Sequence, residues 1–321
     1  MMMYLNVLVG FILLLGAAEL LVRGAVDLAA RLGVPPLVIG MTIVAFGTSA
    51  PELVISVDAV LNGATGLAVG NIVGSNIANI LLILGVAAII RPILDKPDIL
   101  LRDALMLMSG SLLFAVLVVM DAIDQTAAVV FLFVLLVFLW TSYQQHSNGD
   151  ADEFSMPSTN DAKKKHISIS IILVIVGLTG LVFGAELLVD GGTVIARSFN
   201  VSEEVIGLTL LALGTSLPEL AASVVAARRG HVDVAIGNVV GSNLFNMFAV
   251  GGLSALIVPL PVISQISNFD IWVMMASTVM IMPVLIWGWR VTRIHAVIYL
   301  ALYSLYISAQ VYGVDRLLDR I

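Results

Sequence analysis

Long apolar stretches fill this chain, and short polar segments separate them. Stretches of about 20 apolar residues are typical of helices that cross a bilayer. We expect ten such spans, at 5–22, 37–61, 65–90, 103–120, 126–142, 168–188, 203–227, 233–257, 270–288 and 294–312. One long polar stretch, from Thr141 to His166, has no apolar periodicity and is interpreted as a solvated linker. The pattern therefore predicts an all-α polytopic membrane protein with five spans on either side of a linker.

Composition agrees with the pattern. The chain is 60% hydrophobic and 12% charged, with a mean hydropathy of +1.08, whereas a soluble domain carries roughly 25% charged residues. The first apolar stretch lacks a basic leader and a small-residue cleavage site, so we expect it to be a retained span and not a signal peptide. There is no cysteine, which excludes disulfides and thiol chemistry.

An internal duplication joins the two halves. The peptide GTSAPEL at 47–53 recurs as GTSLPEL at 214–220, and GNIVGSN at 70–76 recurs as GNVVGSN at 237–243, both shifted by 167 residues without a gap (219 − 52 = 167). We expect a first repeat at 1–142 with its motif at 40–91, a linker at 143–167, and a second repeat at 168–321 with its motif at 207–258. Because each repeat has an odd number of spans, the second enters the membrane from the opposite side, which predicts an inverted pair.

Basic residues predict the orientation. One side of the membrane receives twelve of them and the other side three, Arg197, Arg316 and Arg320. The basic side is expected to be cytoplasmic, which puts the linker inside, both termini outside, and the protein in a bacterial inner (plasma) membrane. The twelve are Arg23, Arg31, Arg91, Lys96, Arg102, Lys163, Lys164, Lys165, Arg228, Arg229, Arg290 and Arg293.

The first repeated motif carries the candidate chemistry. Pro51 removes a backbone donor and predicts a break in its span, which would free carbonyls near Ala45 and Phe46. Glu52 lies beside this break, with the hydroxyls of Thr48 and Ser49, and the second copy supplies Ala212, Thr215, Ser216 and Glu219. Carboxylates, hydroxyls and carbonyls are hard oxygen ligands that suit Ca²⁺ or Na⁺. An ionisable residue within a span is costly, so its default interpretation is functional.

The second motif adds amides and hydroxyls. Ser75 and Asn79 share a helix face, as do Ser242 and Asn246. Asn71, Asn76, Asn238 and Asn243 lie nearby, and the glycines Gly70, Gly74, Gly237 and Gly241 form small-xxx-small pairs that favour close packing. Serine and threonine within a span commonly bond their own helix, so packing is the alternative for this motif taken alone.

Other charged residues give weaker signals. Glu19 and Glu186 recur near the ends of their spans, and a packing or gating role and a ligand role both remain open. Asp58 has no counterpart, since Val225 occupies the matched position. The four histidines form no cluster, and Asp150, Asp152 and Glu153 are too irregular for a calcium loop, so they are interpreted as part of the solvated linker.

Two copies of G-T-S-x-P-E, each followed by G-N-x-x-G-S-N-x-x-N, resemble the two alpha repeats of the sodium/calcium exchanger family of cation/calcium antiporters. The resemblance implies ten helices in two inverted repeats, four ion sites at the midplane, and two helices, the first and sixth, that slide across the other eight. It also implies ligand roles for Glu52, Glu219, Thr48, Ser49, Thr215, Ser216, Ser75, Ser242 and Asn79, and carbonyl ligands at Ala45 and Ala212.

Asn246 is also expected to be an ion ligand, but it departs from the family pattern, because several family members have aspartate there. With asparagine at both Asn79 and Asn246, the site has two formal negative charges, enough to balance one Ca²⁺. Potassium co-transport is therefore disfavoured. The charge count leaves both Na⁺ and H⁺ open as the counter-ion, and Na⁺ is favoured because the proton-coupled branch of the superfamily usually has a different acidic signature around its repeats.

We expect an antiporter of Ca²⁺ and Na⁺ and not an enzyme, with these ions as cargo, no cofactor, the lipid bilayer as surroundings, no nucleic acid and no obligatory protein partner. The alternatives are an H⁺/Ca²⁺ antiporter or a carrier of another divalent cation on the same fold, a cation channel, and, least favoured, an intramembrane hydrolase.

Overall fold

A computed structural model describes residues 2–94, 101–147, 166–199 and 212–313 of the chain. Helices account for almost all of this part, and one isolated bridge joins Ile93 to Val291. The first half contains α1 (Met2–Leu32), α2 (Pro36–Ile39), η1 (Gly40–Val44), α3 (Ala45–Thr48), α4 (Ala50–Leu61), α5 (Thr65–Ala78), η2 (Asn79–Leu84), α6 (Gly85–Ile90), α7 (Leu101–Val119) and α8 (Gln125–Ser147). The second contains α9 (Ile167–Ser198), α11 (Ala212–Thr215), α12 (Leu217–Arg229), α13 (Val232–Phe245), η6 (Asn246–Val250), α14 (Gly251–Ile257), η7 (Ile266–Asp270), α15 (Ile271–Trp287) and α16 (Arg293–Tyr312).

The helices confirm the expected membrane architecture. In the described part of the chain, eight helices are long and apolar enough to cross a membrane, and one further pair, Pro36–Thr48 with Ala50–Leu61, is bent by 40° at a break. The remaining expected span, 203–227, begins outside the described residues, and its described part is α11 and α12. Of the expected linker, 148–165 lies outside the described residues.

Two helices are much longer than the spans expected for them. The first span was expected at 5–22, but α1 continues to Leu32, and the sixth was expected at 168–188, but α9 continues to Ser198. Charged residues such as Arg23 and Asp190 end the apolar stretch without ending the helix. The reason is that backbone hydrogen bonds hold a helix together wherever its residues tolerate helical geometry, whether lipid or water surrounds it.

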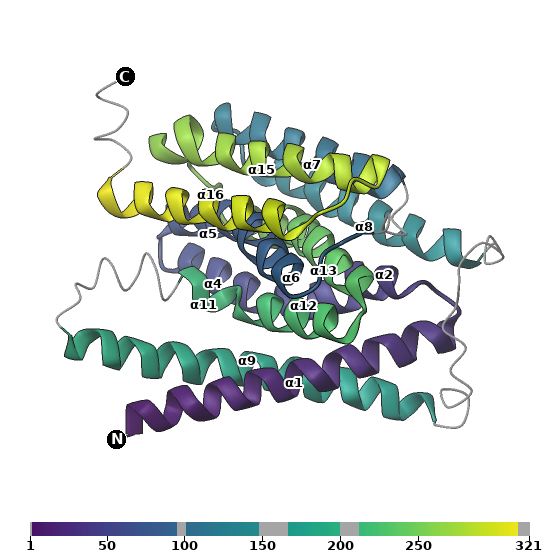
Figure 1. Ribbon diagram of the computed structural model, residues 1–321. Coiled ribbons are helices and arrows are strands. Elements are labelled where there is room, and N and C mark those ends of the chain that lie inside the picture. The colour runs from purple at the N-terminus through teal and green to yellow at the C-terminus, as the bar shows by residue number, and fades with distance from the viewer. Residues whose placement is uncertain (1, 95–100, 148–165, 200–211, 314–321) are drawn as a thin grey trace.

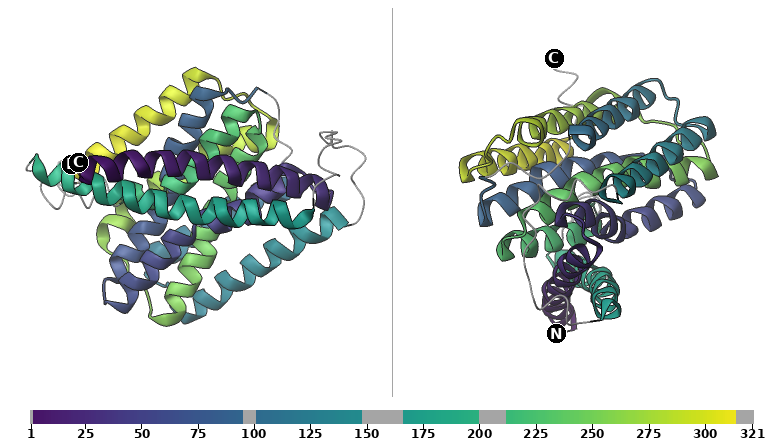
Figure 2. Two further views of the ribbon diagram at one scale, coloured as in Figure 1. Left: turned by 90° about the horizontal axis from the view of Figure 1, so that it is seen from below. Right: turned by 90° about the vertical axis from the view of Figure 1, so that its right-hand side faces the viewer.

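These two long helices lie side by side along one face of the molecule. The views of Figures 1 and 2 agree that α1 and α9 form a pair set apart from the remaining helices. In Figure 1, α1 begins and α16 ends at the left end of the molecule, called here the terminal end. The end of α8 and the beginning of α9 lie at the right end, called here the linker end.

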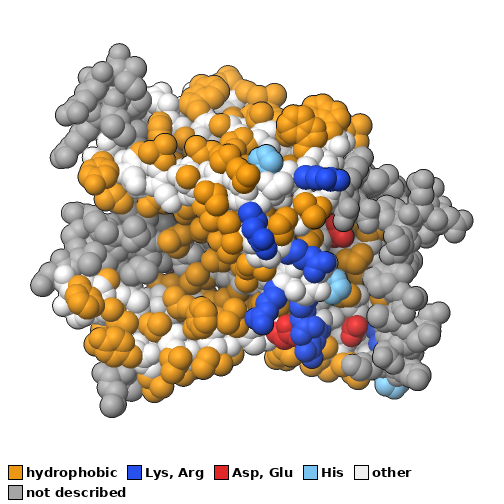
Figure 3. All heavy atoms as spheres, in the orientation of Figure 1, with side chains coloured by type: hydrophobic (Ala, Val, Ile, Leu, Met, Phe, Trp, Pro, Cys, Tyr) orange, Lys and Arg blue, Asp and Glu red, His pale blue; other side chains and the backbone are white. Residues whose placement is uncertain are grey.

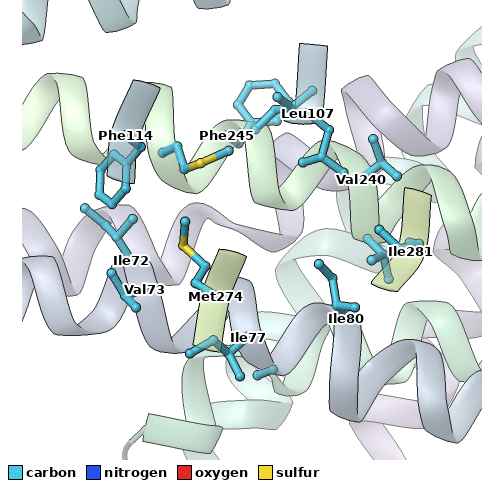
Figure 4. Packing of buried hydrophobic residues seen from close by; sticks show 14 of the residues in the cluster. Ile72, Val73, Ile77, Ile80, Leu107, Phe114, Val240, Phe245, Met274 and Ile281 are labelled. Atoms are coloured by element: carbon cyan, nitrogen blue, oxygen red, sulfur yellow. The ribbon is translucent and has the colours of Figure 1, made fainter. Parts of the chain in front are cut away.

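The centre of the molecule consists of the helices that carry the second motif. In α5, η2 and α6, 78% of the span is buried, and in α13, η6 and α14, 83% is buried. Their apolar side chains interlock with α7 and α15, as Figure 4 shows for Ile72 and Val73 beside Phe114 and for Ile80 facing Ile281. Burial inside protein on all sides makes this region a rigid support for polar groups placed in it.

Short π-helical segments interrupt these central helices at matched positions. η2 begins at Asn79 and η6 begins at Asn246, and these two residues are related by the 167-residue offset (246 − 79 = 167). A π-helical turn inserts an extra residue into an α-helix and often marks a functional site. The sequence gives no local signal for these turns, and in both an asparagine is the first residue of the π-helical segment.

Candidate ion-binding site

The two Thr-Ser-x-Pro-Glu motifs break their spans in the same way. Ser49 and Ser216 leave helical geometry, with ψ of 4° and 2°, and a new helix begins directly after each. Pro51 and Pro218 lie in the first turn of the new helices, where a missing N–H costs nothing. The expected break is thus confirmed, and it puts each glutamate in the first turn of a helix, where negative charge is favoured.

Each glutamate is held by the serine of the opposite repeat. Ser49 Oγ donates to Glu219 Oε1 at 3.1 Å, and Ser216 Oγ donates to Glu52 Oε1 at 3.4 Å. Both carboxylates are 1% exposed. Because the offset of 167 exchanges these two contacts, they form a reciprocal pair of the kind that a pseudo-two-fold axis generates. The two halves therefore share one site.

Two asparagines hold the broken spans in place, again symmetrically. Asn71 Nδ2 donates to the Glu52 carbonyl at 3.3 Å and to Ser56 Oγ at 3.0 Å. In the second repeat Asn238 Nδ2 donates to the Glu219 carbonyl at 3.4 Å and to Ser223 Oγ at 3.1 Å. Asn238 also accepts a hydrogen bond from Thr48 Oγ1 at 3.1 Å. These amides tie the motif helices to the central helices and position the carboxylates.

Several buried oxygens of the two repeated motifs have no hydrogen-bond partner. Among the described residues these include Oε2 of Glu52 and Glu219, Oγ1 of Thr215, Oγ of Ser75 and Ser242, and Oδ1 of Asn76, Asn79 and Asn246. An unsatisfied buried polar group costs about 1–3 kcal/mol, and native proteins contain few of them. Carboxylate, hydroxyl and amide oxygens are the ligand types that a hard cation such as Ca²⁺ or Na⁺ prefers, so these atoms are candidate ion ligands.

The break does not free the backbone carbonyl of Ala45, although the sequence had led us to expect it. The reason is that this carbonyl accepts the Ser49 N–H at 2.9 Å. In the second repeat Ser216 donates its N–H to Leu213 at 3.1 Å and not to Ala212. A carbonyl oxygen has two lone pairs, so a ligand role for Ala45 and Ala212 stays a prediction.

The amides of the second motif are not symmetric. Asn79 Nδ2 donates to Asn243 Oδ1 at 2.9 Å, and Asn243 Nδ2 reaches the Asn76 carbonyl at 3.5 Å. Asn246, which matches Asn79, is fully buried and makes no side-chain hydrogen bond in the described structure. The amide of Asn246 is thus free to turn toward a bound ion.

Other acidic residues lie outside this cluster. Glu19 is ion-paired with Arg23 and Arg229, whereas Glu186 and Asp58 are exposed. In the part of the chain that the structure describes, no group of three or more acidic, histidine or cysteine side chains could share a metal ion. The site therefore depends on two carboxylates supplemented by neutral oxygens.

Two buried carboxylates escaped the sequence analysis. Asp103 and Asp270 are 3% and 5% exposed and are matched by the same offset (270 − 103 = 167). Arg102 donates to Asp103 at 2.9 Å, and Gln265 and Gln310 donate to Asp270. Applying the offset to every acidic residue would have found this pair. Their partners do not belong to the glutamate cluster, and Gln310 ties α16 to the start of α15.

Comparisons with known proteins agree with this geometry. The family model for the sodium/calcium exchanger protein matches residues 3–144 and 169–312. The chain is 37% identical to a putative antiporter, CaxA, of Alkalimonas amylolytica, covering 85% of this chain and 86% of that protein. It is 31% identical to the sodium/calcium exchanger MaX1 of Methanosarcina acetivorans, covering 96% and 98%. Among solved structures, the sodium-calcium exchanger NCX_Mj matches with a TM-score of 0.83 and 32% identity over 96% of this chain and 98% of that one.

Proposed function

The chain belongs to the sodium/calcium exchanger family, and we propose that it exchanges Na⁺ for Ca²⁺ across a membrane at the Glu52–Glu219 cluster. The observation that carries the proposal is the reciprocal serine–glutamate contact. Each carboxylate has one oxygen held by the opposite repeat and one oxygen without a partner. The two free oxygens are the strongest cation ligands in the cluster.

Charge balance explains why this site suits an exchanger. Two ionised carboxylates balance one Ca²⁺, and the surrounding hydroxyl and amide oxygens complete a coordination shell of six to eight ligands. Several Na⁺ ions use the same oxygens, so the two loads exclude each other. A loaded site is close to neutral and crosses an apolar barrier at lower cost than the bare carboxylates do. Exchange is therefore favoured over leak.

Orientation in the membrane is a further part of the proposal. On the face drawn in Figure 3 the described Lys and Arg side chains gather to the right of the middle, toward the linker end. Basic residues favour the cytoplasmic side. This supports a cytoplasmic linker end and termini outside. A relative 36% identical over 78% of this chain, from Escherichia coli, is called an inner membrane protein, which supports a location in a bacterial-type inner membrane.

Uptake of radioactive calcium tests the proposal directly. Purified protein is placed in proteoliposomes loaded with Na⁺ and diluted into Na⁺-free buffer, with a pH gradient alone as the control. We expect uptake that requires internal Na⁺ and that Glu219→Gln abolishes. Uptake driven only by the pH gradient would make the protein an H⁺/Ca²⁺ antiporter, and Ca²⁺ flux without any coupling gradient would make it a channel.

A further inference from the structure

Glu19 connects the outer helix pair to the centre of the molecule at the linker end. Its carboxylate pairs with Arg23, four residues along α1, at 2.7 Å, and with Arg229 at the end of α12. Glu19 is 28% exposed and Arg229 is 36% exposed, so neither charge is fully surrounded by water. The contact with Arg229, here called the linker-end ion pair, joins residues from opposite repeats.

The terminal end has no equivalent of this pair. Shifted by the 167-residue offset, Glu19 becomes Glu186, Arg23 becomes Asp190, and Arg229 becomes Asn62. Glu186 and Asp190 are both negative and lie four apart on one helix, which is unfavourable. Asn62 carries no charge and donates to the Asp58 carbonyl at 2.9 Å. None of these three residues makes an ion pair in the described part of the chain.

Helix packing has the same asymmetry. At the linker end α1 packs along α12, and Val225 and Ala222 of α12 are buried in a cluster with Leu21 and Ala25 of α1. The matched contact at the terminal end would bring α9 against α4, yet among the described residues α9 packs instead against α12, α11 and α3. The linker end is thus closed by α1 in this structure in a way that the terminal end is not closed by α9.

Inverted repeats imply a second state in which the two repeats exchange roles, since alternating access moves one part of such a protein against the other around a fixed site. In that state α9 would close the terminal end and α1 would leave α12, which breaks the contact between Glu19 and Arg229. We propose that the linker-end ion pair is a one-sided latch that favours the state closed at the linker end. It makes the two access states unequal, because the residues matched to the pair by the offset, Glu186, Asp190 and Asn62, offer no pair of opposite charges to compensate. This inference rests on the proposed function, which requires alternating access.

The size of the effect follows from the exposure of the partners. Ion pairs with partly exposed partners contribute about 0.2–1 kcal/mol, which corresponds to roughly a 1.4- to 5-fold shift in an equilibrium. When the pair is removed, the fraction of protein that is open at the linker end should increase by that factor. Since apparent affinity scales with the fraction of competent protein, KM for Ca²⁺ applied at the linker end should fall by roughly the same factor. KM at the terminal end should barely change.

Labelling of a single cysteine tests the inference, and the natural chain has no cysteine to interfere. Val225→Cys puts a thiol in the surface that α1 covers, where Val225 is 7% exposed. Reaction with a water-soluble maleimide is then compared in Arg229→Gln, Glu19→Gln and the double variant. We expect each single variant to label about 1.4- to fivefold faster, the range for partly exposed ion pairs, and the double variant to label no faster than either.

Matched controls separate the latch from a general change in charge. Arg228→Gln removes the neighbouring exposed arginine, which makes no ion pair in the described structure. Glu186→Gln removes the carboxylate that the offset matches to Glu19. Neither variant should change the rate of labelling. Arg229→Lys keeps the charge and should restore most of the slow labelling. That result would also exclude a folding defect as the reason for faster labelling in Arg229→Gln. The latch proposal would be overturned if Arg228→Gln labelled as fast as the variants of the pair. It would also be overturned if neither Glu19→Gln nor Arg229→Gln labelled faster than the unmodified pair. Loss of sodium-dependent uptake in the unmodified protein would instead overturn the proposed function.

Discussion

The outer pair, α1 with α9, and the central helices that carry Asn79 and Asn246 are all apolar enough to cross a membrane, but they are buried to very different degrees. Only 33% and 28% of the spans in α1 and α9 are buried, against 78% and 83% in the two central spans. The outer pair faces lipid over most of its surface and touches the centre along one side. The central spans are enclosed by protein. Polar atoms can therefore remain unpaired in the centre without meeting lipid, and the unpaired oxygens of Ser75, Asn79, Ser242 and Asn246, which are candidate ion ligands, lie in these central spans.

Small residues allow close backbone packing in the outer pair. Gly177 of α9 lies so close to α1 that an added Cβ would be 2.6 Å from the Leu21 backbone nitrogen, and Gly10 of α1 approaches the Gly184 carbonyl in the same way. These glycines let the two backbones touch, which is how membrane helices pack without a hydrophobic driving force. The outer pair is consequently held to itself by backbone contact and is suited to move as one body across the centre.

Removing one central carboxylate should have the largest effect. Glu52→Gln or Glu219→Gln keeps the shape of the side chain but leaves one negative charge to balance Ca²⁺. We expect sodium-dependent calcium uptake to fall by at least 100-fold, the loss of about 3 kcal/mol or more of ion binding. Glu186→Gln, an exposed carboxylate of the outer pair, is the control and should retain uptake. Full activity in either central variant would refute the site.

A methyl group in the outer interface should have the next largest effect. Gly→Ala within a helix normally stabilises by up to about 1 kcal/mol. In Gly177→Ala the new Cβ meets the backbone of α1, so we expect destabilisation by about 1–3 kcal/mol from overpacking. Thermal unfolding in detergent measures the change. Gly16→Ala on α1 has no atom within 4 Å of its new Cβ and should be neutral or stabilising; similar behaviour of the two variants would disprove close backbone packing.

Asn246→Ala should separate binding from stability in the centre. Both amide atoms of Asn246 are buried without a partner, so their removal takes away no hydrogen bond of this structure and should leave the melting temperature nearly unchanged. If the amide oxygen binds the ion, KM for Ca²⁺ should rise by about tenfold. A tenfold change in affinity corresponds to the free energy of about one hydrogen bond to a charged group. A normal KM would show that Asn246 is not a ligand.

The smallest effect is expected at the edge of the centre, where His231 follows α12. Burial, with Arg229 and Arg91 nearby, lowers the pKa of His231 below its usual value. The unfolded chain then binds a proton that the folded protein does not, so the free energy of unfolding should decrease as pH falls through about 6.5. His231→Gln should flatten the dependence of melting temperature on pH between about 7.5 and 5.5. His166→Gln, at an exposed helix start, is the control, and an unchanged slope in His231→Gln would contradict the prediction.

Much of the fold follows from the sequence because it depends on local patterns. The span expected at 65–90 coincides with α5 through α6, and the break expected at Pro51 lies at Ser49. Hydropathy misplaced the ends of α1 and α9, because a charged residue stops an apolar stretch but not a helix. The π-helical turns at Asn79 and Asn246 were not predicted, since nothing in the local sequence distinguishes them from α-helix.

The sequence by itself determined the duplication, the inverted pair of five-span repeats and the candidate oxygen ligands, because repeats, apolar length and side-chain chemistry can be read along one chain. Only the tertiary structure decided that Ser49 holds Glu219 and Ser216 holds Glu52, which buried oxygens remain unpaired, and that Glu19 meets Arg229 at one end alone. Those contacts join residues more than 160 positions apart. Spacing along a helix specifies only its own neighbours, whereas contacts between helices depend on how their whole surfaces pack.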